Sequence, residues 1–303
     1  MGIKMGPGAL YLRFHQKFGH GLRVAWYRDV IRKRILKTPP IRNLTDDRCE
    51  IHAFTSMMDW LNLVWALKSF YRYSKRRYGL CIHGDGTLAG SELEELKVHF
   101  PDARIVHRHK ADDLVLHKLK DFPRLQEFRR NNLLAPKIVD FVSYLQSDRM
   151  LVFDSDILFF SEPTTLIQRI ESEDYRLNTF ISDFQSAYTI DPVKAEHLLN
   201  FKVLPCFNSG LGLAHKDSIR YDWLEEFLAL PGITEGYFWR IEQTLYALCS
   251  SRYGFEPLPE EYTLYLDEGI CNRPFRHYVG SIRHLMYKEG IRKLYKAGFL
   301  SVT

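Results

Sequence analysis

The sequence lacks the features that mark membrane-spanning, secreted and disulfide-stabilised proteins. No apolar stretch in its 303 residues approaches the roughly 20 that a membrane-spanning helix needs. The N-terminus has neither the apolar core nor the small-residue cleavage site of a secretory signal peptide. The cysteines are scattered and form no CxxC pair, which predicts buried free thiols in a reducing compartment and neither a disulfide framework nor a zinc site. These absences favour a cytoplasmic protein; the five cysteines are Cys49, Cys81, Cys206, Cys249 and Cys271.

Positive charge is concentrated near both ends of the chain. The net charge is +5, and eight Lys and Arg residues lie between positions 13 and 37 against one acidic residue, Asp29. Apolar and aromatic side chains are interleaved with these cations, and residues 285–300 have the same character. Such segments either lie peripherally on the anionic inner face of a membrane or pack on a domain with a solvated basic face. Nucleic acid is disfavoured, because no recognised binding motif accompanies the charge.

The chain divides into three parts by composition. Hydrophobic residues make up 46% and charged residues 26%, which is ordinary for a globular protein of one large domain with appendages. We expect a basic helical leader over residues 1–45, a single globular domain over 46–287 and a basic tail over 288–303.

Strand and helix patterns alternate from residue 49 onward. Short apolar runs predict strands, amphipathic patterns predict helices, and Ser91 is the expected N-cap of the second helix. This alternation predicts an α/β fold with a mostly parallel, Rossmann-like sheet flanked by helices. Ligands bind such sheets beyond the carboxyl ends of the strands. The predicted strands are 49–54, 78–83, 103–107 and 149–153, and the predicted helices are 60–73, 91–100 and 133–147.

Two aspartates directly follow the strand 149–153, within the run "MLVFDSDILFF". Asp154 and Asp156 point the same way if the segment is extended, so both can face one ligand. Two carboxylates so near each other require a cation between them, and oxygen ligands suit Mg²⁺ or Mn²⁺. The alternative is an acidic pair in a surface turn, because roughly one Asp-x-Asp is expected by chance in this composition.

Three further segments place polar residues in apolar surroundings. Asn208-Ser209-Gly210 interrupts the strand-like run 206–215, and a Gly there permits close approach of a ligand. Glu242 and Gln243 lie near the start of the helical segment 239–249. His277, Gly280 and Arg283 follow one another at intervals of three. Taken singly, these segments are equally typical of a strand bulge, a solvated helix start and a polar loop.

In this order, the segments resemble the motifs of retaining glycosyltransferases of family 8, which have the GT-A fold. That family carries a DxD at a strand end, then FN[AS]G, a helix start similar to D-Q-D, and HxxGxxK near the C-terminus. The corresponding segments here are 154–156, 207–210, 242–244 and 277–283, and the resemblance covers roughly residues 49–287.

The resemblance implies a metal-dependent enzyme that transfers a hexose from a nucleotide sugar, with UDP as the expected nucleotide, to a glycan or lipid-linked acceptor. It implies retention of the anomeric configuration. Asp154, Asp156 and His277 would hold Mn²⁺ (or Mg²⁺) against the donor diphosphate, with Ser155 between the two acids also contacting the donor. Lys137 matches a basic residue near the donor, and Asp183 matches a position beside the sugar and acceptor.

The chemistry of these residue types agrees with transfer from a glycosyl diphosphate. Lys137 and Arg283 can neutralise the charge that develops on the departing diphosphate, and Gly280 lets the backbone approach a phosphate. Asn208 and Gln243 can hydrogen-bond sugar hydroxyls and orient the anomeric carbon. Glu242 is the expected stabiliser of the oxocarbenium-like centre.

The sequence departs from the family pattern at several positions. Ser56, within Thr55-Ser56-Met57-Met58, stands where the family has an acid and an Asn that contact the base and ribose, and Asp59 follows as an alternative contact. Arg283 replaces the motif's Lys, and His284-Leu285 stands where Pro-Trp is common.

Three rival functions are consistent with parts of this pattern. An inverting GT-A transferase would use Asp183 or Glu242 as the base that activates the acceptor. A non-catalytic protein that binds nucleotide sugars would keep the same donor contacts. A nucleotidyltransferase is disfavoured, because no Gly-rich phosphate loop follows the first strand.

Overall fold

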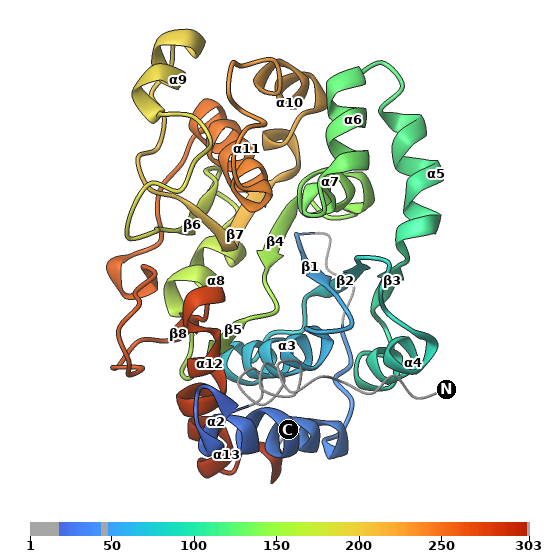
Figure 1. Cartoon of the computed structure of the whole chain (residues 1–303), viewed down its shortest axis with the longest axis vertical. Coiled ribbons are helices and arrows are strands. Elements are labelled where there is room, and N and C mark those ends of the chain that lie inside the picture. Colours follow the sequence, from blue (N-terminus) through green and yellow to red (C-terminus); the bar gives the residue numbers. More distant parts are fainter. Residues whose placement is uncertain (1–17, 44–47, 302–303) are drawn as a thin grey trace, which may run out of the picture.

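A six-stranded sheet forms the centre of the protein. The computed structural model describes residues 18–43 and 48–301 (Figure 1). The strand order is β3-β2-β1-β4-β7-β6, with β1 to β4 mutually parallel and β7 antiparallel to both of its neighbours. The predicted mostly parallel α/β sheet is therefore confirmed. The strands are β1 Cys49–Thr55, β2 Gly79–Gly84, β3 Arg104–Val106, β4 Arg149–Phe153, β6 Thr179–Ile181 and β7 Asn208–His215.

Helices cover both faces of this sheet (Figure 1). Successive strand side chains point to opposite faces, so Leu151 and Phe153 enter one hydrophobic cluster while Met150 and Val152 enter the other. The first cluster lies under α3 Trp60–Ser74, α4 Gly90–His99, α8 Thr164–Glu171 and the C-terminal helices α12 Arg283–Leu285 and α13 Arg292–Lys296. The second lies under α5 Arg108–Lys118, α6 Pro123–Asn131, α7 Val139–Tyr144, α9 Pro192–Leu199, α10 Tyr221–Phe227 and α11 Phe238–Tyr253.

The described part of the basic leader packs on the domain beside the C-terminal helices. It consists of α2 Leu22–Trp26, η1 Tyr27–Ile31 and η2 Arg32–Lys37. Ile31 and Ile35 are buried, and the Trp65 indole N–H donates to the backbone oxygen of Arg32 at 2.8 Å. The Arg34 guanidinium donates to the Tyr295 hydroxyl on α13 at 2.8 Å, and α2 and η1 both contact η7 Met286–Ile291, which directly precedes α13 (Figure 1).

Some predictions about the leader fall outside the described residues. Residues 1–17, which include the cations Arg13 and Lys17, lie outside the described part of the chain. Residues 44–47, where the proposed boundary between leader and domain lies, do so as well. The division at 45/46 and 287/288 stays a prediction. Over residues 18–43 and 48–301, no helix is long and apolar enough to cross a membrane.

Three local predictions were wrong. The single helix expected over 133–147 is broken into η3 Ala135–Lys137 and α7, because Pro136 lacks the N–H that a continuous helix needs. Ser91 does not cap α4, which begins at Gly90, and its hydroxyl instead donates to the adjacent Glu92. The cysteines were predicted to be buried, but Cys206 is only half-buried and Cys271 is exposed.

One close contact between neighbouring strands supplies a test of the packing. Gly212 on β7 lies opposite Phe180 on β6, and a Cβ at Gly212 would lie 2.1 Å from the Phe180 ring. We expect Gly212→Ala to lower the free energy of unfolding by about 1–3 kcal/mol, as overpacked core positions do. Gly90→Ala is the matched control, since nothing lies within 4 Å of the methyl group that it would add and stability should not fall. Urea unfolding of both variants measures the difference; equal midpoints would contradict this packing.

Candidate functional site

A cavity of about 830 Å³ lies beyond the carboxyl ends of β4 and β6. Asp154 directly follows β4, and Asp183 lies two residues beyond β6. Because β7 runs antiparallel to β4, its first residues lie beside the last residues of β4, and the Asp154 N–H donates to the Gly210 oxygen at 2.8 Å. The antiparallel strand therefore brings the segment Asn208–Gly210 to the same edge of the sheet as the Asp-x-Asp pair.

A second, two-stranded sheet brings His277 to the aspartates. β5 Ile157–Phe159 pairs with β8 Phe275–His277 in antiparallel register, with Ile157 opposite His277. The Tyr278 N–H also donates to the backbone oxygen of Asp156 at 2.8 Å. Gly210 leaves room for the imidazole, since a Cβ there would lie 2.2 Å from the Cε1 atom of His277. Sequence patterns did not predict this sheet, because it pairs two segments that lie more than 100 residues apart in the chain.

Cationic groups surround the two carboxylates. The Lys137 ammonium lies 2.7 Å from Asp154 Oδ1, and the His277 Nε2 atom lies 3.1 Å from Asp156 Oδ1 and 3.7 Å from Asp154 Oδ2. The Arg283 guanidinium bridges Asp156 and Asp59, at 2.9 Å from the latter. The candidate ligand atoms of Asp154, Asp156 and His277 lie within 4.8 Å of one another. Two carboxylates and one imidazole that converge in this way fit Mn²⁺, and Mg²⁺ less well, because imidazole suits the later divalent metals.

Burial and charge act against each other on the ionisable groups of the cavity. Burial alone would raise the pKa of Asp156, but His277 and Arg283 outweigh it and hold the pKa below its ordinary value. Burial would lower the pKa of His277, yet the neighbouring Asp156 carboxylate raises it. For Glu242, burial prevails over the attraction of Lys137, 3.6 Å away, and raises the pKa to about 7.

The four residues predicted to act on the sugar all line this cavity. The Asn208 amide donates to Asp183 Oδ2 at 3.1 Å, and the Ser209 hydroxyl donates to Glu242 Oε2 at 3.1 Å. Gln243 on α11 donates to the backbone oxygen of Ala187, at 3.4 Å. Residues from three separate segments, the loop after β6, the start of β7 and α11, thus converge on one space. Lys137, Asp154, Asp156, His277, Gly280 and Arg283 line it as well.

Two predicted donor contacts lie outside the cavity lining. Ser56 directly follows β1, and its hydroxyl oxygen accepts a hydrogen bond from the Met58 N–H at 3.2 Å. Ser155, between the two aspartates in sequence, is buried. The roles predicted for both stay predictions. Asp59, weighed as a substitute contact, instead holds Arg283.

Sequence reasoning missed the apolar wall of the cavity. The apolar residues Phe184, Phe238, Trp239, Leu264 and Leu266 line the same cavity as the charged groups. The one available signal was the aromatic run 237–239 at the start of α11, whose side chains are all at least 40% exposed. Three consecutive aromatic residues with exposed side chains are unusual unless they contact a ligand or a partner.

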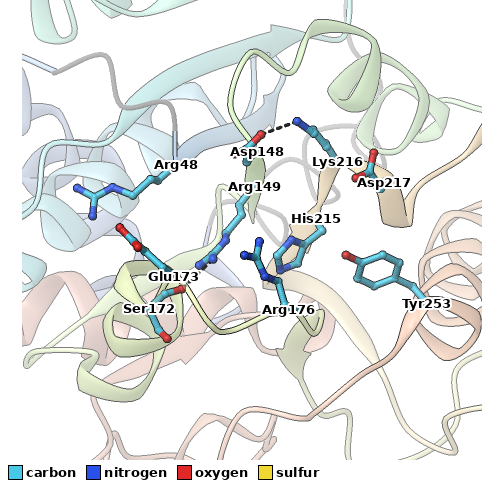
Figure 2. A pocket seen from close by; sticks show the side chains of 10 residues that line it. All are labelled: Arg48, Asp148, Arg149, Ser172, Glu173, Arg176, His215, Lys216, Asp217 and Tyr253. Atoms are coloured by element: carbon cyan, nitrogen blue, oxygen red, sulfur yellow. Dashed lines mark hydrogen bonds and ion pairs between the residues drawn. The ribbon is translucent and has the colours of Figure 1, made fainter.

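A second cavity, of about 470 Å³, lies at the opposite edge of the sheet (Figure 2). It adjoins the start of β4 and the end of β7, where Arg149 and His215 are paired. Cations and acids are mixed around it, including the ion pair between Asp148 and Lys216. None of the predicted site residues lines it.

The fold was compared with known proteins. No protein-family model matches the sequence, and no curated protein matches it. Mouse xyloside xylosyltransferase 1 superposes with a TM-score of 0.53 at 11% identity, over 80% of this chain and 99% of that one. The chain has a GT-A glycosyltransferase fold.

Two further solved structures agree with this fold. The galactosyltransferase LgtC, in complex with donor and acceptor sugar analogues, gives a TM-score of 0.50 at 12% identity, over 84% of this chain and 97% of that one. The bifunctional glycosyltransferase WbbM gives 0.50 at 11% identity, over 85% of this chain and 53% of that one. At these identities the likeness establishes the architecture, and membership of family 8 stays a prediction.

The raised pKa of Glu242 predicts a specific dependence of stability on pH. Between its ordinary pKa of 4.5 and about 7, the unfolded chain releases the proton while the folded protein keeps it, so stability falls as pH rises through this range. In the presence of a metal chelator, the free energy of unfolding of the wild type, taken relative to that of Glu242→Gln, should fall by roughly 3 kcal/mol from pH 4.5 to pH 7 and then level off. Glu94→Gln, on the exposed surface of α4, should show the wild-type dependence. Denaturant unfolding across pH measures this; parallel curves for wild type and Glu242→Gln would show that Glu242 ionises normally.

Proposed function

We propose that the protein is a metal-dependent glycosyltransferase that moves a hexose from a nucleotide sugar, with UDP as the nucleotide, to a glycan or lipid-linked acceptor. The observation that carries this proposal is the convergence of Asp154, Asp156 and His277 with Lys137 at the carboxyl edge of a GT-A sheet. The cavity of about 830 Å³ is large enough for a nucleotide sugar, since ligand cavities of this kind span roughly 300–1,000 Å³.

The charged side of the cavity would bind the donor diphosphate. A bound Mn²⁺ or Mg²⁺, held by Asp154, Asp156 and His277, supplies Lewis-acid stabilisation to the departing diphosphate. Lys137 and Arg283 are the further cations, and both are held by carboxylates that the metal would neutralise. Their positive charge is then available to the phosphate oxygens, with Arg283 offering a planar pair of donors.

The remaining residues would position the sugar and the acceptor. Asn208 and Gln243 supply amides for sugar hydroxyls, and Asp183, tied to Asn208, lies at the same end of the cavity. The apolar wall with Phe238 and Trp239 offers flat surfaces for the non-polar face of a sugar ring or for a lipid chain of the acceptor.

We propose retention of the anomeric configuration by front-face attack, on the basis of the motif resemblance. The inverting alternative needs a base, for which Asp183 and Glu242 are the two carboxylates in the cavity lining apart from the Asp-x-Asp pair. The anomeric configuration of the product, read by NMR, separates the two routes.

Metal and donor binding test the central assignment. Asp154→Asn and Asp156→Asn should each abolish Mn²⁺-dependent binding of UDP, because each removes an ionised metal ligand. His277→Ala should weaken Mn²⁺ binding by on the order of tenfold or more, and Arg283→Ala should mainly lower turnover. Isothermal titration with UDP and Mn²⁺ measures the first two effects, with Asp148→Asn, at the opposite edge of the sheet, as the control.

Two outcomes would contradict the assignment. If both aspartate variants bound UDP in the presence of Mn²⁺ with wild-type affinity, Asp154 and Asp156 would not be metal ligands but an acidic pair in a surface turn. A protein that binds UDP-sugars with Mn²⁺ but hydrolyses none of a donor panel, and transfers none to sugar acceptors, would be a non-catalytic binding protein.

We further propose that the basic leader holds this cytoplasmic enzyme peripherally on an anionic membrane. Its outer face carries Leu22, Trp26 and Val30, whose side chains are 75%, 53% and 38% exposed. Their spacing of four residues places them on one helix face. The cations Arg23, Lys33 and Arg34 are exposed on the same segment. Each cation near an anionic surface contributes about 1 kcal/mol, and a tryptophan prefers the membrane interface.

Sedimentation with liposomes tests the membrane proposal. The full chain should sediment with anionic vesicles at low salt and not with neutral ones, and Leu22→Ser together with Trp26→Ser should reduce the bound fraction severalfold. Leu198→Ser, an exposed apolar residue on α9, is the control. Absence of binding to anionic vesicles by the wild type would leave the leader with a packing role alone.

A further inference from the structure

A second group of metal-binding side chains lies inside the sheet, apart from the Asp-x-Asp cavity. His52 on β1 and Cys81 on β2 are register partners, and His83 follows Cys81 by two residues on the same face. All three are buried, with no more than 2% exposure. Their candidate ligand atoms lie within 4.8 Å of one another. Core sheet positions normally carry apolar residues, so three such side chains together require an explanation.

The hydrogen bonds around His52 direct a lone pair toward the other two residues. His52 Nε2 lies 3.0 Å from Glu50 Oε2, and this carboxylate also accepts from Arg104 at 2.6 Å and from the Gln146 N–H. A carboxylate held in this way accepts, so His52 carries its proton on Nε2. The Nδ1 atom is then unprotonated and faces His83 Nε2 at 3.1 Å.

The thiol completes a set of three donors. Cys81 Sγ lies 3.3 Å from the same His83 Nε2 atom. Without an ion, the His83 Nε2–H would donate to His52 Nδ1. Among the described residues, His83 Nδ1 has no hydrogen-bond partner, so the ring can carry its proton there instead and leave Nε2 to bind a cation. Tetrahedral zinc with ordinary Zn–N and Zn–S bonds separates such ligand atoms by roughly 3.3–3.6 Å, close to the distances here.

We propose that His52, Cys81 and His83 bind a zinc ion that joins β1 to β2. Binding would release the Cys81 thiol proton to solvent and move the His83 proton from Nε2 to Nδ1, because thiolate and neutral imidazole are the binding forms. Glu50 would orient His52 from behind, in the carboxylate–histidine–zinc arrangement that many zinc sites share. Arg104 balances the charge of that carboxylate.

The three donors leave the fourth position of a tetrahedral zinc ion to a water molecule. The Phe141 ring on α7 lies 4.7 Å from the His83 ring and 5.3 Å from the His52 ring, and closes the site on the helix side. The three donors come from adjacent strands of the rigid sheet, so the ion needs no rearrangement of the backbone. The site is independent of the proposed glycosyltransferase function.

Metal analysis of the full chain, purified without a polyhistidine tag, tests the proposal. The wild type should hold one zinc ion per chain after dialysis, and Asp156→Asn should hold the same amount because the cavity site is separate. Cys81→Ser and His83→Gln should lower the zinc content at least tenfold. Cys249→Ser, which removes a buried thiol on α11, should leave it unchanged.

Cobalt supplies a readout that does not depend on the variants folding. Added to zinc-free wild-type protein, Co²⁺ should produce the near-ultraviolet absorption of a cobalt–thiolate bond, and zinc should remove it. Zinc content in the wild type no higher than in Cys81→Ser, or absence of the thiolate absorption with cobalt, would overturn the proposal and leave the cluster as a hydrogen-bonded part of the core.

Discussion

The arrangement of the candidate site depends on one electrostatic constraint, which is that Asp154 and Asp156 lie together in a largely buried space. Two ionised carboxylates in a medium of low dielectric repel each other and lose their hydration, so they are stable only beside positive charge. The protein supplies that charge from three directions, through Lys137, His277 and Arg283. These residues come from η3, β8 and α12, so elements distant in sequence are joined at this point.

The reversed direction of β7 makes this convergence possible. In an all-parallel sheet, the start of a strand lies at the edge opposite the carboxyl ends of its neighbours. Because β7 is antiparallel, Asn208–Gly210 at its start lie beside Asp154 and Asp183, which follow the ends of β4 and β6. The absence of a side chain at Gly210 then allows the His277 ring to approach. One strand reversal and one glycine thus set the geometry of the cavity.

The parallel part of the sheet and the α/β class could be predicted from the sequence, because alternating patterns of apolar residues report local structure directly. The strands β1 to β4 and the helices α3, α4 and α11 lie within a few residues of their predicted bounds. The helix over 133–147 was mispredicted because the apolar pattern continues through Pro136, where the hydrogen-bond pattern cannot. The strands β5 and β8 were missed, since they stand outside the alternation of strands and helices and pair only with each other, across more than 100 residues of chain.

The sequence by itself determined which residues are chemically unusual: a pair of aspartates after an apolar strand, an Asn-Ser-Gly within another, and a histidine, glycine and arginine at regular spacing. Tertiary structure decided which of them meet. Asp59 forms an ion pair with Arg283, whereas Ser56 lies outside the cavity lining, although both residues follow the same strand. Likewise, the grouping of His52, Cys81 and His83 depends on the register of β1 against β2. Spacing along the chain does not contain that register, because hydrogen bonds between strands and the packing of their buried faces set it.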